Sequence, residues 1–377
     1  MNAAIREHMI VGGGLAGAMA ALRLARAGHD VVLFEKERSA HHKVCGEFLS
    51  PEAVAYLHDA GVDPLQLGAV EIGQLRVSVR RRVTATDLPF RALSLSRHIV
   101  DEALLNQAVQ AGCDVRRGQA VQQLSRESGE WIAALGDGRI ERAKNVFLAT
   151  GKHDLRGWNR PEGAHAGLVG FKMHWRLGEA ATRSLRGFMD LYLFSGGYGG
   201  LALIEHECAN LCLVVRRERL RQLGDWRGLL AALCAENEFI ARTLSGARAL
   251  WERPLAISSI PYGYLAEESQ AAWRVGDQAA VIPSFTGDGM AIALHSGATA
   301  AAMCLAGRTP DEYLHTLQGQ LRSGMSIATA LSRAMVSRTG RCLAPAMISF
   351  LPRPIHWIAR ATRIPAGAVR TPAFHAR

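Results

Sequence analysis

The feature that most constrains this chain is a glycine triplet between an apolar run and a helix-forming run near the N-terminus. Gly12, Gly14 and Gly17 directly follow Met9–Val11. In this order the first glycine makes a tight turn, the second lets a pyrophosphate approach the backbone, and the third lets helix and strand pack closely. The N–H groups and positive dipole end of the helix face the phosphates. The segment therefore predicts a Rossmann-like dinucleotide site.

An acidic residue ends the second predicted strand. Val31–Phe34 is a short apolar run, and Glu35 follows it at the distance from Gly17 that this fold uses for a ribose contact. A carboxylate there accepts hydrogen bonds from a ribose diol and repels a 2′-phosphate. NADP is therefore disfavoured at this site, and NAD and FAD remain open.

Length and composition are those of a compact α/β protein with two closely joined domains. The chain has 377 residues, 49% of them hydrophobic, with no uninterrupted run of 18 apolar residues. The first predicted strand starts so early that we expect no signal peptide. Seven cysteines without a C-x-x-C pair indicate reduced cytosolic thiols. No His, Cys and carboxylate spacing suits a metal, and His41-His42 is expected in a solvated loop.

The positive charge is concentrated at the C-terminus. Nine arginines and no acidic residue follow Glu312, within a net charge of +10. Such a block favours an acidic neighbour: a membrane surface at the inner face of the membrane, an acidic carrier protein, or a charged substrate. The stretch Arg341–Pro365 mixes Arg and Trp with apolar residues as interfacial segments do, although its prolines argue against one long helix. Plain structural packing is the alternative. No basic-aromatic module indicates nucleic-acid binding.

Two later segments decide between the dinucleotides. A predicted strand ends in Thr150-Gly151, and another ends in Gly276-Asp277 before a loop and an Ala-rich helix from about Gly289. This order resembles the large flavoprotein family that includes aromatic-ring hydroxylases and geranylgeranyl reductases. The resemblance implies FAD, with Asp277 on the ribityl chain and the helix N-terminus facing the flavin ring.

The same resemblance supplies a set of expected FAD contacts. Ser94–Val121 looks like the family's Arg-led helix and following strand, so Arg97 is expected at the ribityl or phosphate region; a surface helix cap is its alternative. The expected cofactor residues are Gly12, Gly14, Leu15, Ala16, Gly17, Glu35, Lys36, Lys43, Cys45, Gly46, Arg97, Val121, Thr150, Gly151, Gly276, Asp277, Pro283, Gly287, Gly289 and Met290.

Local motifs favour the reductase branch of the family. Lys43, Cys45 and Gly46 are similar to the Cys-Gly motif of geranylgeranyl reductases, and Glu47 stands where many of them have another glycine. The histidine that hydroxylases commonly carry after Gly-Asp is absent, because Gln278 follows Asp277, and so is the Asp-Gly segment tied to NADPH use. Cys45 is a candidate catalytic residue, or a small residue that fills space against the ring.

The expected substrate region departs from the reductases. Residues 74–89 are predicted as an edge strand, 167–251 as a strand-rich stretch with a helix over 226–244. In Ser195–Leu203 the reductases keep a Tyr-x-Trp-x-Phe-Pro signature, of which only Tyr198 remains; smaller residues follow it, at positions 200, 202 and 203. Tyr198 is the second candidate catalytic residue, and the pocket is expected to be reshaped.

The sequence thus predicts an α/β fold: a Rossmann-like FAD-binding domain (1–73, 94–165 and 257–310), an antiparallel substrate sheet (74–93 and 166–256) and a basic C-terminal helical segment (311–377). The leading hypothesis is a cytoplasmic monooxygenase that hydroxylates a hydrophobic or aromatic small molecule through a flavin C4a-hydroperoxide, with NADPH or NADH as external electron donor. The alternatives are a reductase of C=C bonds in a lipophilic substrate and a flavin-binding module without turnover.

Overall fold

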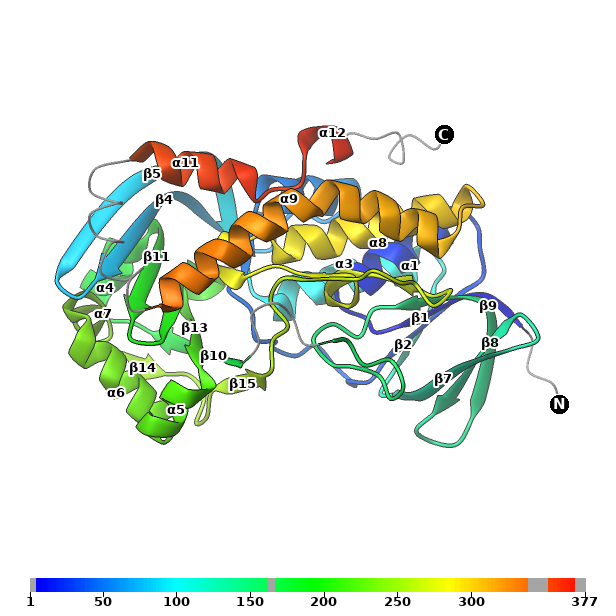
Figure 1. Ribbon diagram of the computed structural model, residues 1–377, viewed down its shortest axis with the longest axis horizontal. Helices are drawn as coiled ribbons and strands as arrows, with labels where there is room; N and C mark the ends of the chain where they lie inside the picture. Colours follow the sequence, from blue (N-terminus) through cyan, green and yellow to red (C-terminus); the bar gives the residue numbers. More distant parts are fainter. Residues whose placement is uncertain (1–4, 162–166, 338–351, 370–377) are drawn as a thin grey trace.

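A computed structural model describes residues 5–161, 167–337 and 352–369. The chain forms two sheets that lie side by side, each with helices packed against it, and long helices run along the top of both (Figure 1). The first sheet belongs to the nucleotide-binding half and the second to the half expected to hold the substrate. The α/β fold predicted from the sequence is confirmed.

The first sheet has the order β6-β2-β1-β9-β8-β7, with β17 paired to β9. Its parallel part is β6, β2, β1, β9 and β17, and β8 and β7 extend it as antiparallel strands. The helices that pack together over it are α1, α3 and α8. The bounds are β1 Arg6–Val11, β2 Val31–Glu35, β6 Asp114–Arg117, β7 Val121–Glu127, β8 Glu130–Leu135, β9 Ile140–Leu148, β17 Trp273–Arg274, α1 Leu15–Arg26, α3 Arg97–Gln110 and α8 Gly289–Leu305.

The second sheet has the order β14-β10-β13-β12-β11-β4-β5-β3, with β15 also paired to β10. Every pair is antiparallel except β11 with β4, which is parallel. The bounds are β3 Phe48–Leu49, β4 Val70–Val79, β5 Arg82–Ser94, β10 Leu168–Arg176, β11 Gly187–Phe194, β12 Gly197–Ile204, β13 Cys208–Arg216, β14 Arg248–Ala249 and β15 Leu255–Ser258. β16 Tyr264–Leu265 and β18 Ala280–Val281 form a separate small pair.

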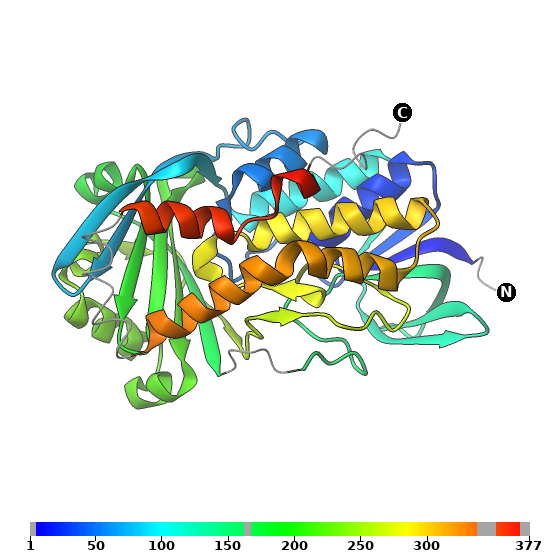
Figure 2. The same ribbon diagram turned by 45° about the horizontal axis from the view of Figure 1, so that its top comes forward.

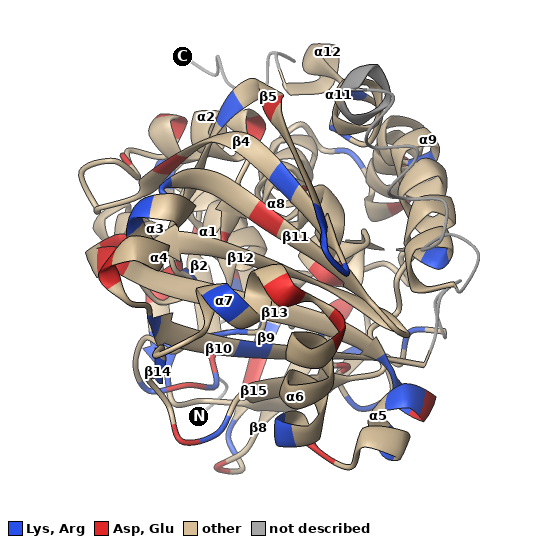
Figure 3. Ribbon diagram, turned by 90° about the vertical axis from the view of Figure 1, so that its left-hand side faces the viewer, with Lys and Arg blue, Asp and Glu red and all other residues tan. Residues whose placement is uncertain are grey.

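One face of the second sheet, the outer face, is covered by short helices. Apolar residues of β10–β13 alternate along the strands and pack against Leu229, Leu233 and Ile240 of α6 and α7. Acidic and basic residues are interspersed along the ribbon on this side of the molecule (Figure 3). The helices on this side are α4 Glu179–Leu185, α5 Arg217–Leu223, α6 Trp226–Glu236 and α7 Glu238–Thr243. The other face of the sheet, the inner face, is turned to the nucleotide-binding half.

Long helices tie the two halves together. α9 (Pro310–Val336) contacts α8 and β17 in one half and β11 and β12 in the other (Figure 2). Its start carries a capping box, in which Thr309 and Glu312 exchange side-chain and backbone hydrogen bonds. α11 (Pro352–Ala361) lies along β5, and α2 (Pro51–Asp59) and α12 (Ala366–Val369) are the remaining α-helices of the described residues. No described helix is both long and apolar enough to cross a bilayer.

Three expectations about secondary structure need correction. Residues 74–89 are not one edge strand but parts of the β4–β5 hairpin, whose turn includes Arg80 at φ +57°. The helix predicted over 226–244 is two helices, because Asn237 leaves helical geometry and caps the second one. The strand that the family resemblance implies at the end of Ser94–Val121, over residues 115–121, is split into β6 and β7.

Candidate active site

Two of the motif glycines are required by backbone contact. Gly12 has φ +110°, and a Cβ there would lie 2.4 Å from the Ala149 carbonyl oxygen. A Cβ on Gly17 would lie 2.0 Å from the Gly12 carbonyl oxygen. No side chain fits at either position, so β1, β9 and α1 approach one another as closely as a nucleotide-binding turn demands.

The middle glycine faces open space flanked by two cations. A Cβ on Gly14 would meet only the tips of Arg97 and Lys43, each at 3.6 Å. Asp101 holds both: its carboxylate accepts from Arg97 Nε at 2.6 Å and from Lys43 Nζ at 2.8 Å. Burial alone raises the pKa of Asp101, but these two charges lower that pKa to about 2. The helix N-terminus and the two cations together make a site for a pyrophosphate.

Glu35 is committed to backbone contacts beside this site. Its Oε2 accepts from Gly13 N and its Oε1 from Glu37 N, both at 2.9 Å. The same carboxylate lines a small pocket with Lys43, Asp101 and Arg117. This is the position expected for a ribose, with two backbone bonds fixing the carboxylate before the ribose arrives.

The loop before α8 approaches the motif from the other side. Gly276 has φ +60°, and its Cβ would lie 3.0 Å from Ala16 Cβ; a Cβ on Gly297 would lie 2.3 Å from the Ala16 carbonyl oxygen. Asp277 Oδ2 pairs with Lys152 Nζ at 3.2 Å. Gly287, at φ +75°, lies under the Phe48 ring. The first turn of α1 thereby packs against the Gly276 turn and against the middle of α8.

The remaining expected cofactor residues divide by position. Leu15 is buried in the first turn of α1, and Met290 is buried in the first turn of α8, which begins at Gly289. Pro283 precedes the 3-10 turn that leads into α8.

The other expected cofactor residues lie near the ends of β2, β6 and β9. Thr150 donates to the His153 carbonyl and Gly151 has φ +64°. Gly46 lies in the loop beside Cys45, and Lys36 is exposed after β2. Val121 packs into a hydrophobic cluster with Trp131; Arg117 of β6 lines the pocket beside Glu35.

The inner face of the second sheet presents small and polar side chains in cross-strand rows. Gly200, Cys212 and Lys172 lie opposite one another on β12, β13 and β10, and Ala202, Asn210 and His174 form the next row. Tyr198 lies one row further along β12. These residues come from three strands that the sequence pattern alone does not align.

Tyr198 joins the inner face to the loop before α8. Its hydroxyl lies 3.1 Å from Ser284 Oγ, and its ring meets Phe285 edge-on. Tyr262 is buried in the same group, and burial raises the pKa of both tyrosines. Both phenols therefore remain protonated at neutral pH. The sheet and the cofactor half meet here through neutral hydrogen-bonding groups.

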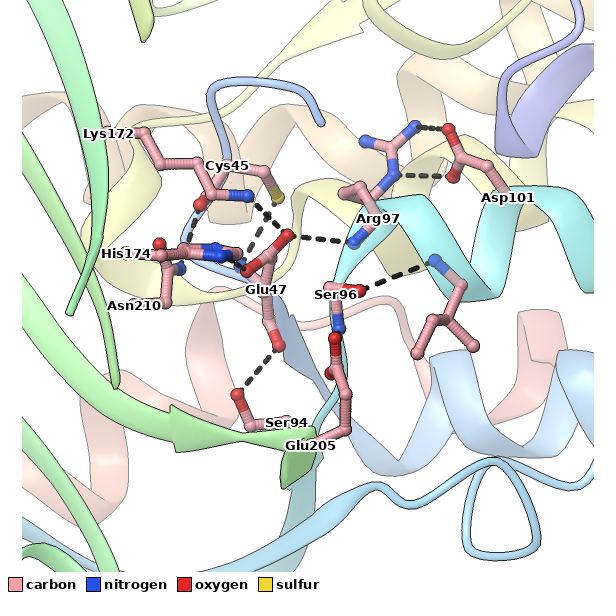
Figure 4. A network of polar contacts seen from close by, with 11 residues as sticks. Cys45, Glu47, Ser94, Ser96, Arg97, Asp101, Lys172, His174, Glu205 and Asn210 are labelled. Carbon is pink, nitrogen blue, oxygen red and sulfur yellow. Dashed lines mark hydrogen bonds and ion pairs between the residues drawn. The ribbon is translucent and has the colours of Figure 1, made fainter. Parts of the chain in front are cut away.

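A buried ionic cluster lies beside this contact, centred on Glu47 (Figure 4). Glu47 is fully buried and has φ +59°, a conformation that favours glycine and costs other residues about 1–3 kcal/mol. Its carboxylate pairs with the buried Lys172, accepts from Arg97 N at 2.8 Å and contacts His174 Nε2 at 3.1 Å. Burial raises the pKa of Glu47, but Lys172 and His174 outweigh this effect and the net pKa is lowered. Glu47 is therefore an anion inside the protein.

The histidine pair departs from expectation. His42 is not in a solvated loop: its ring packs against His98, His174 and Trp251 at centroid distances of 4.9 Å. Burial and the Lys172 charge lower the pKa of His42 to about 4. Ligand-type atoms of His42, Glu47 and His174 lie within 4.8 Å of one another. The Lys172 ammonium already pairs with the Glu47 carboxylate, however. It takes the place that a metal cation would have in this cluster.

Sequence reasoning missed Lys172, His174, Asn210 and the role of Glu47. The first three lie at alternate positions of strands whose outer residues are apolar, and a polar residue at an inward position was the available signal. Glu47 carried a signal as well, since it replaces a glycine of the resembling reductases. Cys45 Sγ accepts from Glu47 N at 3.4 Å, so the candidate thiol and the anion share one loop.

The residues present fit FAD. We call the group of Gly12, Gly17, Lys43, Arg97 and Glu35 the cradle. It combines glycines that admit no side chain, two cations beside Gly14 and a carboxylate at the ribose position, and it continues to the Gly276–Gly289 loop. Arg97, Lys43 and Glu35 would hold the pyrophosphate and ribose, and the α8 N-terminus would face the ring.

Comparisons with known proteins agree with this geometry. Residues 7–146 match the family model of the FAD binding domain. Protein FixC of Escherichia coli K12 is 29% identical over 41% of this chain. The chain spans only 39% of the length of FixC in this match. The menaquinone reductase of Mycolicibacterium smegmatis is 24% identical over 86% of this chain and 83% of its own length.

Solved structures share the whole fold. PqsL of Pseudomonas aeruginosa, described as a "probable FAD-dependent monooxygenase", has a TM-score of 0.69 and 20% identity to this chain. The match covers 90% of this chain and 99% of PqsL. The halogenase PltM in complex with phloroglucinol and FAD has a TM-score of 0.74 and 14% identity over 94% of this chain and 84% of its own. The chain therefore carries an FAD-binding domain over residues 7–146 and shares its overall fold with PqsL and PltM.

Proposed function

We propose that this protein is a monooxygenase that hydroxylates a hydrophobic aromatic small molecule. The observation that carries the proposal is the contact of the sheet's inner face with the loop before α8, where Tyr198 reaches Ser284. Tyr198, Tyr262 and Ser284 are uncharged at neutral pH and close this side of the inner face against the loop. Oxygen transfer needs such packing, because water would divert a reactive oxygen species.

Bound FAD would supply the redox chemistry, with two electrons from NADPH or NADH. One atom of O2 enters the aromatic ring in place of hydrogen and the other leaves as water. The chain's residues orient the substrate on the inner face and place protonated phenols, Tyr198 and Tyr262, within it.

The second candidate is a reductase of a lipophilic quinone or C=C bond. It is favoured by the match to menaquinone reductase over most of both chains and by the Lys43, Cys45 and Gly46 motif. Against it stand the small residues Gly200 and Ala202, where the resembling reductases have bulky ones. Either activity uses a lipophilic substrate on the same face.

Oxygen labelling distinguishes the two candidates. FAD-loaded protein, NADPH or NADH and a panel of alkylphenols are incubated under ¹⁸O2, and the products are analysed by mass spectrometry. The proposal expects one ¹⁸O atom per hydroxylated product, formed faster than hydrogen peroxide. Anaerobic reduction of menaquinone analogues, without label in any phenol, would replace the monooxygenase by the reductase.

A further inference from the structure

Two stretches where the chain departs from the hydroxylase pattern contact each other. Gln278 follows Asp277 in place of a histidine, and Gly151–His153 stands in the region of the missing Asp-Gly segment. The Gln278 Nε2 group donates to the carbonyl oxygens of Gly151 and His153, at 2.9 and 3.1 Å. The loop after β9 is thereby joined to the loop before α8.

A buried arginine fixes the same junction. Arg160 donates to the carbonyl oxygens of Lys152 and Asp277, at 2.9 and 2.6 Å, and its side chain is only 3% exposed. These bonds hold the backbones of the two loops in place. Between them the Lys152 ammonium lies 3.2 Å from Asp277 Oδ2, so this ion pair is built into the junction.

The ion pair lies at the border of the cradle. On the lysine side, the Ala149 carbonyl oxygen lies against Gly12, and on the aspartate side Gly276 packs against Ala16 in the first turn of α1. The side chains of the lysine and the aspartate are 27% and 23% exposed. A molecule bound in the cradle can therefore reach both of them.

The lysine adds a positive charge to those that the cradle already has. The Asp277 carboxylate raises the pKa of Lys152, so the amine is protonated at neutral pH. Arg97, which lies beside Gly14, is close enough for its charge to act on the same ammonium. The loop after β9 and the start of α3 thus bring positive charge to one site.

We propose that the Lys152 ammonium acts on bound FAD and raises its reduction potential. A hydride delivers two electrons and one proton, so oxidised FAD gains one negative charge when it is reduced. The Asp277 carboxylate alone would disfavour that charge, and the ammonium beside it offsets the effect. The inference goes beyond the proposed function, because it holds whether the reduced cofactor then reacts with O2 or with a quinone.

The test measures the potential of the cofactor and not turnover. Wild-type protein and Lys152→Met, both saturated with FAD, are reduced anaerobically by xanthine and xanthine oxidase beside a dye of known potential, and the two spectra are followed together. In Lys152→Met we expect the reduced cofactor to be disfavoured at least tenfold relative to the oxidised one, which is about 30 mV for a two-electron couple. Lys152→Gln, a second neutral variant, should give the same result, whereas Lys152→Arg keeps the charge and should stay within about threefold of wild type.

Two further variants complete the test. Lys152→Met combined with Asp277→Asn removes both charges, and its potential should return towards that of wild type. Lys144→Met is the matched control, because Lys144 is exposed on β9, and it should leave the potential unchanged. An unchanged potential in the neutral Lys152 variants overturns the proposal, also where FAD binds more weakly, since Lys152 would then hold the cofactor without acting on its charge. A lowered potential in those variants, without ¹⁸O transfer by wild type, would contradict the monooxygenase and leave this inference standing.

Discussion

The cofactor cradle and the inner face of the second sheet are built in different ways. The cradle is mostly backbone: Gly12 and Gly17 serve by lacking a side chain, within six consecutive residues. The inner face is made of side chains, and Glu47 meets Lys172 and His174 across more than 120 residues of sequence. The cradle has no space for an added side-chain atom, whereas the inner face depends on ion pairs between side chains. Substitutions in the cradle should therefore reduce FAD affinity, and substitutions in the ion pairs should reduce the stability of the fold.

The cradle should show the largest effect. Gly17→Ala places a methyl group 2.0 Å from the Gly12 carbonyl, so α1 must move away from the phosphate site. We expect FAD affinity to fall at least 1,000-fold, about 4 kcal/mol, in fluorescence titrations. Gly319→Ala adds the same methyl group in open space and should bind FAD as wild type does. Near-normal affinity in Gly17→Ala would show that the turn is not under steric constraint.

The ionic cluster should fail by loss of a partner. Glu47→Gln leaves the Lys172 ammonium buried without its anion, and we expect unfolding free energy to drop by about 3–4 kcal/mol in urea. The double variant Glu47→Gln with Lys172→Met removes both charges and should recover most of that loss. Because the pKa of Glu47 is lowered in the folded protein, its stabilisation is present at neutral pH and is lost as the pH falls through that value. If the double variant were no more stable than the single one, charge pairing would not be what stabilises this cluster.

The junction of the two regions should respond to pH with the opposite sign. Asp288 directly precedes α8 and accepts from Thr362 Oγ1 at 3.1 Å, and burial raises its pKa to about 6 from 3.8. Stability is therefore greatest with the carboxyl protonated and falls as the pH rises through about 6. The difference is on the order of 3 kcal/mol for a shift of this size. Asp288→Asn should lack this decline in denaturation curves between pH 4 and 7, whereas the exposed Asp311→Asn should keep it.

The smallest effect is expected at the capping box that begins α9, the helix that contacts both halves. Thr309→Ala removes one half of the capping box, and we expect a loss of about 1 kcal/mol in unfolding free energy. FAD affinity should not change. Thr309→Ser keeps the hydroxyl and serves as the control, and an equal loss in both variants would point away from the cap.

The same contrast explains what the sequence could predict. Gly12, Gly14, Gly17 and Glu35 act within one strand–helix–strand unit, so their spacing alone indicated their geometry. Lys172, His174 and Asn210 act through strand register, which a single sequence does not reveal. The break at Asn237 and the β4–β5 hairpin were missed for a related reason, since tertiary packing decides whether an apolar stretch continues or turns.

The basic C-terminal segment is described over α9, α11 and α12. α11 lies on β5, where His356 contacts the Asp87 carbonyl at 2.9 Å, and Trp357 is 60% exposed. Contact of this basic segment with a membrane surface or an acidic carrier protein stays a prediction, and residues 338–351 of the stretch lie outside the described part of the chain.

If the cradle and the inner face form one site, a structure of the FAD-loaded protein will show the cofactor in contact with both. We expect the pyrophosphate beside Gly14 between Arg97 and Lys43, and the flavin ring against the row of Gly200, Cys212 and Lys172. A ring that lies outside the space between the α8 N-terminus and the inner face would contradict it.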